Sequence, residues 1–164
     1  MAKITQFAEF VLRSESVPAQ IMAERVGLQP DESAVARSRS IGNHQLPRFH
    51  SWTVKSGVSR KSRLDDHFAA LHRRLKPYAA QIAAVIAKGD VSAVLCVVRH
   101  FEPGTEDPET LQARNDRAAD QVEGLQVLRG QHPLVGFAVD LPLIQFLADV
   151  GACVSFDEYA DEYE

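Results

Sequence analysis

Cysteine is scarce in this sequence, which has two in 164 residues, Cys96 and Cys153. They are far apart and form no CxxC pair, so their spacing indicates neither a disulfide framework nor a zinc site. Each lies in an apolar stretch with the pattern of a strand. We therefore expect both to be small core residues in buried strands of a protein in a reducing cytosol. A disulfide or a shared metal ion is the alternative.

Long apolar runs are absent as well. Gln6, Glu9 and Arg13 interrupt the beginning of the chain, which excludes the usual hydrophobic region of a signal peptide. No apolar stretch approaches the roughly 20 residues that a membrane-spanning helix needs. A hydrophobic content of 45% with 24% charged residues is typical of a globular protein. These features predict a cytoplasmic protein that does not enter a membrane.

Motifs of known chemistry are also missing. The chain has neither the GxSxG nor the SxxK pattern of nucleophilic serines, and neither the GxxxxGKS/T nor the GxGxxG pattern of phosphate-binding loops. His67 and His72 share one predicted helix but are five residues apart, whereas a helical metal pair needs a spacing of four. We therefore expect no catalytic residues, no metal and no cofactor.

The strongest pattern that is present runs from Ser62 to Lys88. Its large apolar residues recur in steps of three and four and so form one stripe of an α-helix. They are Leu64, Phe68, Leu71, Leu75, Tyr78, Ile82, Val85 and Ile86. Ser62 and Asp65 have the spacing of a capping box, which predicts the start of this helix. Pro77 predicts a kink or break near Lys76.

The remaining segments predict the rest of the fold. Strands are expected over residues 4–13, 48–56, 91–101, 134–139 and 152–159, with the first in the centre of the sheet. A short helix with a serine cap from residues 14–18 is expected to end at Gly27, and a second to begin at Asp140 and end at Gly151, with Ile144 among its inward residues. A polar helix is expected over 108–123 and a long surface loop over 31–46.

Together these elements predict an α+β fold. We expect a two-layer sandwich whose mainly antiparallel sheet of about five strands carries a long helix and two shorter ones on one face, with ferredoxin-like elements. The chain is interpreted as a single domain over residues 1–164, in which 102–131 is an insertion.

Charge is distributed unevenly along the chain. Residues 37–76 contain ten Lys or Arg and two acids, a net charge of +8, whereas the remainder carries −12. This pattern predicts a basic binding surface for an acidic protein partner or for self-association. The overall pI near 5.9 argues against nucleic acid as the partner. The candidate binding residues are Arg37, Arg39, Arg48, His50, Trp52, Arg60, Lys61, Arg63, Arg73 and Arg74, with Lys76 beside them.

Several short motifs resemble those of a known bacterial family. They are Gly27-Leu28-Gln29-Pro30, then Trp52 and Ser56-Gly57, the proline inside the long helix, and the closing segments Leu147–Gly151 and Phe156–Tyr159. In these the chain resembles the domain of unknown function numbered forty-two seventy-nine. The resemblance implies a small cytoplasmic α+β domain with no agreed activity and no established catalytic residues.

Three hypotheses for function follow. The first is a non-catalytic binding or interaction domain that uses the basic surface, with an immunity-like role by analogy. The second is a small-ligand pocket under the 31–46 loop, lined by His50, Trp52 and Phe68. The third is a hydrolase-like enzyme that uses Asp66 and His67 with His50 or His100.

Overall fold

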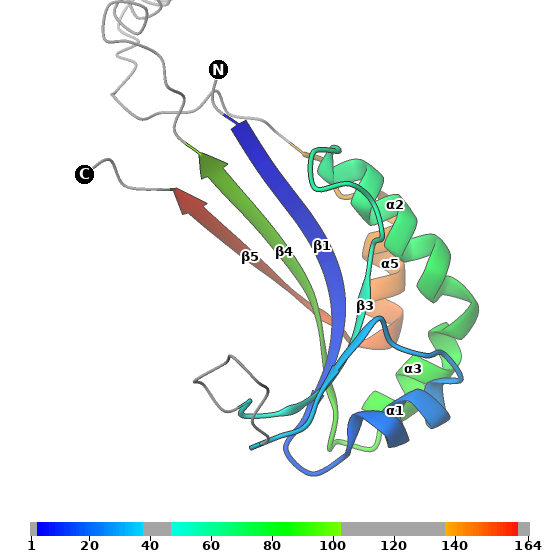
Figure 1. Ribbon diagram of the computed structural model, residues 1–164. Helices are drawn as coiled ribbons and strands as arrows, with labels where there is room; N and C mark the ends of the chain where they lie inside the picture. The colour runs from blue at the N-terminus through cyan, green and yellow to red at the C-terminus, as the bar shows by residue number, and fades with distance from the viewer. Residues whose placement is uncertain (1–2, 38–46, 103–136, 161–164) are drawn as a thin grey trace, which may run out of the picture.

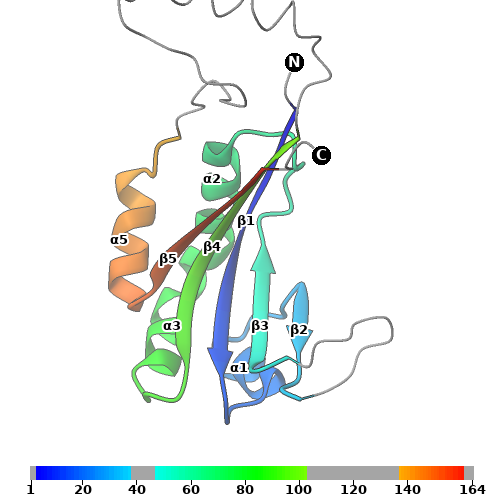
Figure 2. The same ribbon diagram turned by 90° about the vertical axis from the view of Figure 1, so that its left-hand side faces the viewer.

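The computed structural model describes residues 3–37, 47–102 and 137–160. In these ranges a five-stranded sheet packs against helices on one face, so the chain forms a two-layer α+β sandwich (Figure 1 and Figure 2). The strands are β1 (Lys3–Ser14), β2 (Glu32–Ala34), β3 (His50–Lys55), β4 (Ser92–Glu102) and β5 (Cys153–Ala160). The helices are α1 (Ala19–Val26), α2 (Leu64–Leu75), the 3₁₀ turn η1 (Lys76–Tyr78), α3 (Ala79–Ile86) and α5 (Leu141–Val150).

The long strand β1 occupies the centre of the sheet, as predicted, and the strand order is β2-β3-β1-β4-β5. It pairs antiparallel with β3 on one side and with β4 on the other. The strands β3 and β4 therefore run parallel to each other across β1, and α2 and α3 connect them as a split βαβ unit. β5 pairs parallel with β4 after the crossover helix α5. The predicted fold class is confirmed, including its mainly antiparallel sheet.

Alternation along β1 places different side chains on the two faces of the sheet. Ala8, Phe10 and Leu12 face the helices and are almost completely buried. Phe7 and Glu9 belong to the opposite face, which no described helix covers (Figure 1). Burying each large core side chain contributes about 1.5–3 kcal/mol before chain entropy is subtracted. The other large side chains of the core include Met22, Trp52, Val54, Phe68, Leu71, Leu75, Ile82, Leu95, Leu143 and Phe146.

The predicted long helix is divided into α2, η1 and α3. The break falls at Lys76–Tyr78, where Pro77 cannot donate a helical hydrogen bond, so the predicted position of the break is confirmed. The apolar stripe is buried along α2 and α3 as expected. The capping box is wrong: α2 begins after Arg63, and no side chain caps it. Ser62 instead closes a turn, in which its N–H donates to Ser59 O at 2.9 Å.

Other local predictions also need correction. β2 lies in the segment expected to be a loop, where it pairs with β3. No side chain caps α1, because its N-cap residue is Pro18, which has no side-chain acceptor. Ser14 Oγ instead accepts from the backbone N–H groups of Ser16 and Val17, at 3.2 and 2.9 Å. By contrast, Asp140 Oδ1 caps α5 as predicted, accepting from Leu143 N at 3.1 Å. Gly27 and Gly151 end their helices with φ of 80° and 73°, also as predicted.

Burial near the C-terminal end of the described chain differs from expectation. Ile144 is 49% exposed, because it points away from the buried side of α5. Cys96 is half-buried and Cys153 is exposed, because the strand register places both on the sheet face away from the helices.

Residues 137–140 have no strand structure, so the strand expected over 134–139 is wrong in its described part. Residues 134–136, the helix expected over 108–123 and nearly all of the 102–131 insertion lie outside the described residues.

Candidate functional site

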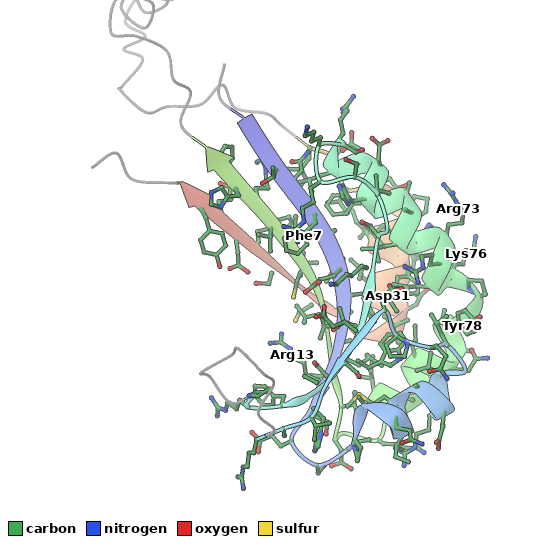
Figure 3. The ribbon with its side chains drawn as sticks, in the orientation of Figure 1. Phe7, Arg13, Asp31, Arg73, Lys76 and Tyr78 are labelled. Atoms are coloured by element: carbon green, nitrogen blue, oxygen red, sulfur yellow. The ribbon has the colours of Figure 1, made fainter. Side chains whose placement is uncertain are left out.

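The structure places the predicted basic residues in three separate parts of the molecule. Arg37 and Arg48 lie near the beginning of β3, while Arg60, Lys61 and Arg63 follow its end and lead into α2. The remaining residues, Arg73, Arg74 and Lys76, lie about 18 Å further along, at the other end of α2 (Figure 3). Arg39 lies outside the described residues. The described basic side chains therefore do not gather on one surface.

Two of the predicted binding residues, His50 and Trp52, have structural contacts. Trp52 is completely buried, and its Nε1–H donates to Leu28 O at 3.0 Å. His50 Nδ1 accepts from Ala36 N at 3.2 Å. Phe68, which was expected to line a pocket with them, is 2% exposed in the core. These three side chains have structural contacts, and residues 38–46 of the loop that was expected to cover the pocket lie outside the described residues.

The predicted hydrolase residues are not brought together either. His50 begins β3, whereas His67 lies in α2, beyond the other end of that strand. β3 alone spans about 17 Å, far more than hydrogen-bond reach. His100 lies in register with Thr5, on the sheet face away from the helices, and Asp66 is exposed. We conclude that no acid–base site forms from this set.

A cleft forms instead where the chain leaves β3 and continues beside β1. Two backbone hydrogen bonds hold this segment: Ser56 N donates to Ala8 O at 3.2 Å, and Gln6 N donates to Arg60 O at 2.8 Å. Between them, one residue of β1, Phe7, lies opposite residues 57–59. The extra residues bulge away from the strand, much as in a wide β-bulge.

The cavity under this bulge has a volume of about 410 Å³. Gly57 begins the bulge with φ of 72°, a conformation that other residues adopt only with strain. Phe7 and Val58 supply apolar side chains to the cavity. All of its lining residues come from β1, β2, the end of β3 and the bulge: Phe7, Ala8, Glu9, Glu32, Lys55, Ser56, Gly57, Val58 and Arg60.

The polar lining of this cleft carries charges of both signs. Lys55 Nζ lies 2.6 Å from Glu32 Oε2, and this hydrogen bond raises the pKa of the Lys55 ammonium. The Arg60 guanidinium lies over the Phe7 ring, 4.9 Å from its centroid. Burial raises the pKa of the Glu9 carboxyl, although the positive charges of Lys55 and Arg60 oppose this rise. A cluster of ionisable groups with a perturbed pKa is typical of binding sites.

Ser56 and His67 meet behind the cleft, where both side chains are buried on the helix side of the sheet. Ser56 Oγ lies 2.6 Å from His67 Nδ1 and also accepts weakly from Val58 N, at 3.4 Å. His67 is completely buried, and its Nε2 has no hydrogen-bond partner among the described residues. Burial lowers the pKa of the imidazole, while the Ser59 backbone and the charge of Asp66 oppose this shift. The sequence does not predict this pair, because no motif relates a residue at a strand end to one in the following helix.

Comparison with known proteins assigns the chain to a family. The model of the family described as "Domain of unknown function (DUF4279)" matches residues 2–120, more than half of the chain. The chain belongs to this DUF4279 family. The resemblance inferred from the sequence motifs is thereby confirmed. Neither the curated proteins nor the solved structures gave a significant match.

The part of the chain matched by DUF4279 contains every residue of the cleft and of the Ser56–His67 pair. α5 and β5 lie beyond the matched residues, as do the closing motifs at Leu147–Gly151 and Phe156–Tyr159. Within the described ranges, no group of three or more His, Cys, Asp or Glu side chains is arranged to hold a metal ion. No helix in the same ranges has both the length and the apolar character needed to cross a membrane.

Proposed function

We propose that this chain is a binding domain and that its site is the cleft between β1 and the bulged segment 56–60. The observation that carries this proposal is a cavity of about 410 Å³ in which an aromatic ring and ionisable groups of both signs converge. Clefts of this size, with apolar walls and a few polar groups, are typical of small-molecule sites. The proposal keeps the binding function inferred from the sequence and moves its site.

The charges of the cleft define the chemistry of the ligand. Arg60 and Lys55 favour an anionic group, whereas Glu9 and Glu32 favour a cationic one. A molecule with both groups and an apolar part between them would satisfy the cleft, and a short peptide with free termini has this composition. An acidic protein on a basic surface has less support, because the described basic residues lie in three separate places.

The cellular setting is also part of the proposal. Cys96 and Cys153 are both free thiols, which is typical of a reducing compartment. We therefore propose a cytoplasmic location, in which short peptides and amino acids are abundant. An immunity-like role remains an analogy to other small α+β domains and rests on no contact in the structure.

The proposal is tested by titrating the ¹⁵N-labelled protein with the unprotected dipeptide alanyl-phenylalanine while recording amide chemical shifts. We expect saturable changes at residues 7–9 and 55–60. A dipeptide with an acetylated amine and an amidated carboxyl should produce much smaller changes, because both charges are lost. Changes confined to other parts of the chain, or equal for the two dipeptides, would contradict the proposed site.

A further inference from the structure

The four charged residues of the cleft are not equivalent, because two of them already neutralise each other. Lys55 Nζ lies 2.6 Å from Glu32 Oε2, so each of these charges has a partner. Glu9 and Arg60 belong to none of the ion pairs that the described residues form. A carboxylate and a guanidinium therefore line one cavity without pairing with each other or with another described side chain.

The Glu9 carboxylate is suited to a cationic ligand group. Glu9 is half-buried on the open face of β1, where its register partners are Lys55 on β3 and Cys96 on β4. Burial raises the pKa of its carboxyl, because the charged form loses water; the charges of Lys55 and Arg60 oppose the rise without contacting it. A partly buried carboxylate without a donor is unfavourable. An ammonium group in the cleft would supply the missing donor.

The Arg60 guanidinium is suited to an anionic ligand group. It lies over the Phe7 ring, 4.9 Å from the ring centroid, which fixes its position relative to β1. This contact uses the charge of the guanidinium and none of its N–H donors. A carboxylate can accept two parallel hydrogen bonds from these donors. Arg60 is therefore the residue of the cleft best placed to bind a carboxylate.

The spacing of residues along β1 sets the distance between the two groups. Phe7, which positions Arg60, and Glu9 are two residues apart on one face of the strand, about 7 Å at 3.3–3.4 Å per residue. An extended dipeptide spans about 7 Å from its amine to its carboxylate, a single amino acid about half of this, and a tripeptide about 10 Å. A dipeptide that lies along β1 thus reaches both groups.

We propose that the cleft selects dipeptides by length and direction, binding the free amine at Glu9 and the free carboxylate at Arg60. The side chains of the dipeptide would lie against Phe7 and Val58, the apolar side chains of the cavity. This inference rests on the proposed function, to which it adds the length of the ligand and its orientation.

The length is tested by titrating the ¹⁵N-labelled full chain with phenylalanine, alanyl-phenylalanine and alanyl-alanyl-phenylalanine. We expect the dipeptide to bind at least about tenfold more tightly than the other two, because each of those leaves one charge of the cleft unpaired. Equal affinities, with shift changes at residues 7–9 and 55–60, would overturn the selection by length and leave the binding site intact. No change at these residues with any of the three would contradict the binding site itself.

The orientation is tested by the same titration with Glu9→Gln. This variant should bind alanyl-phenylalanine about tenfold or more weakly, because the ligand ammonium loses its charged partner. It should bind the N-acetylated dipeptide as the wild type does, since that ligand has no ammonium. An equal loss for both ligands would overturn the assignment of the amine to Glu9. Glu24→Gln, which changes an exposed carboxylate of α1, is the control and should bind both ligands as the wild type does.

Arg60→Ala provides the corresponding test at the other end of the ligand. It should weaken binding of the free dipeptide and leave binding of the N-terminally free, C-terminally amidated dipeptide unchanged, since the amide carries no negative charge. A loss of the same size for both ligands would overturn the assignment of the carboxylate to Arg60.

Discussion

The Arg74 guanidinium donates two parallel hydrogen bonds to the Asp31 carboxylate, with Nη1–Oδ2 and Nη2–Oδ1 distances of 2.8 and 3.0 Å. Arg74 also contacts the backbone oxygen of Lys55, and Asp31 accepts from Lys55 N at 2.7 Å. This pair therefore joins the end of α2 to the end of β3, directly beside the cleft. Arg74 was predicted to lie on a basic binding surface, and these contacts give it a structural role.

We predict a measurable coupling between Arg74 and Asp31. A double-mutant cycle with Arg74→Ala, Asp31→Ala and the double variant should give about 1 kcal/mol in urea unfolding, because the pair is bidentate and partly shielded. Arg63 and Asp65 provide the matched control, since their side chains form a single 2.8 Å contact and Arg63 is 78% exposed. Coupling there should be close to zero. Equal coupling in both pairs would contradict the structural role of Arg74.

The same contact makes a prediction at acid pH. Hydrogen bonding from Arg74 lowers the pKa of the Asp31 carboxyl below its ordinary value of 3.8. Its contribution to stability is present above pH 3.8 and is lost as the pH falls through the lower pKa of the folded state. Carbon NMR of the Asp31 carboxyl should show this low pKa in the wild type and a return toward the ordinary value in Arg74→Ala. An unchanged pKa in the variant would exclude Arg74 as the cause.

His67 makes stability depend on pH in a different range. Its pKa in the folded chain is lowered from 6.5, so the unfolded chain binds the proton first as the pH falls. The free energy of unfolding should therefore be unaffected by His67 above pH 6.5 and should decrease below it. Urea unfolding at about pH 7.5 and about pH 5 measures this decrease. The decrease should be smaller in His67→Asn, and an equal decrease in both proteins would show that His67 is not responsible.

Gly57 is expected to be required for its backbone conformation alone. A methyl group added at Cα would meet no atom within 4 Å, so no steric clash opposes a substitution. The φ of 72° nevertheless disfavours residues with a side chain. Gly57→Ala should lower the free energy of unfolding by about 1 kcal/mol or somewhat more, and Gly57→Asn by less. Equal stability of Gly57→Ala and wild type would show that the bulge adopts another conformation.

The spacing of apolar residues predicted the helices and strands that build the core, because the residues that fit this spacing are the ones that are buried there. The stripe from Leu64 to Val85, the break at Pro77 and the glycines that end α1 and α5 are local properties of the sequence. The burial of the cysteines was wrong for a different reason. An apolar strand such as β4 suggests cover on both faces, and the pattern does not reveal that helices cover only one.

The cleft could not be predicted, because tertiary contacts create it. It depends on Arg60 O accepting from Gln6 N, a hydrogen bond between residues far apart in the chain. The Ser56–His67 pair likewise depends on how α2 packs beside the end of β3. Net charge along residues 37–76 suggested one basic surface, but a strand and a helix separate its members in space.

The most direct test of the cleft as the binding site compares two arginine variants by calorimetry. Arg60 lines the cleft, whereas Arg63, three residues later, pairs with Asp65 outside it. Arg60→Ala should weaken binding of alanyl-phenylalanine by roughly tenfold or more, the loss expected for one charged hydrogen bond, while Arg63→Ala should bind as tightly as the wild type. Equal affinity of the two variants would contradict the assignment of the site.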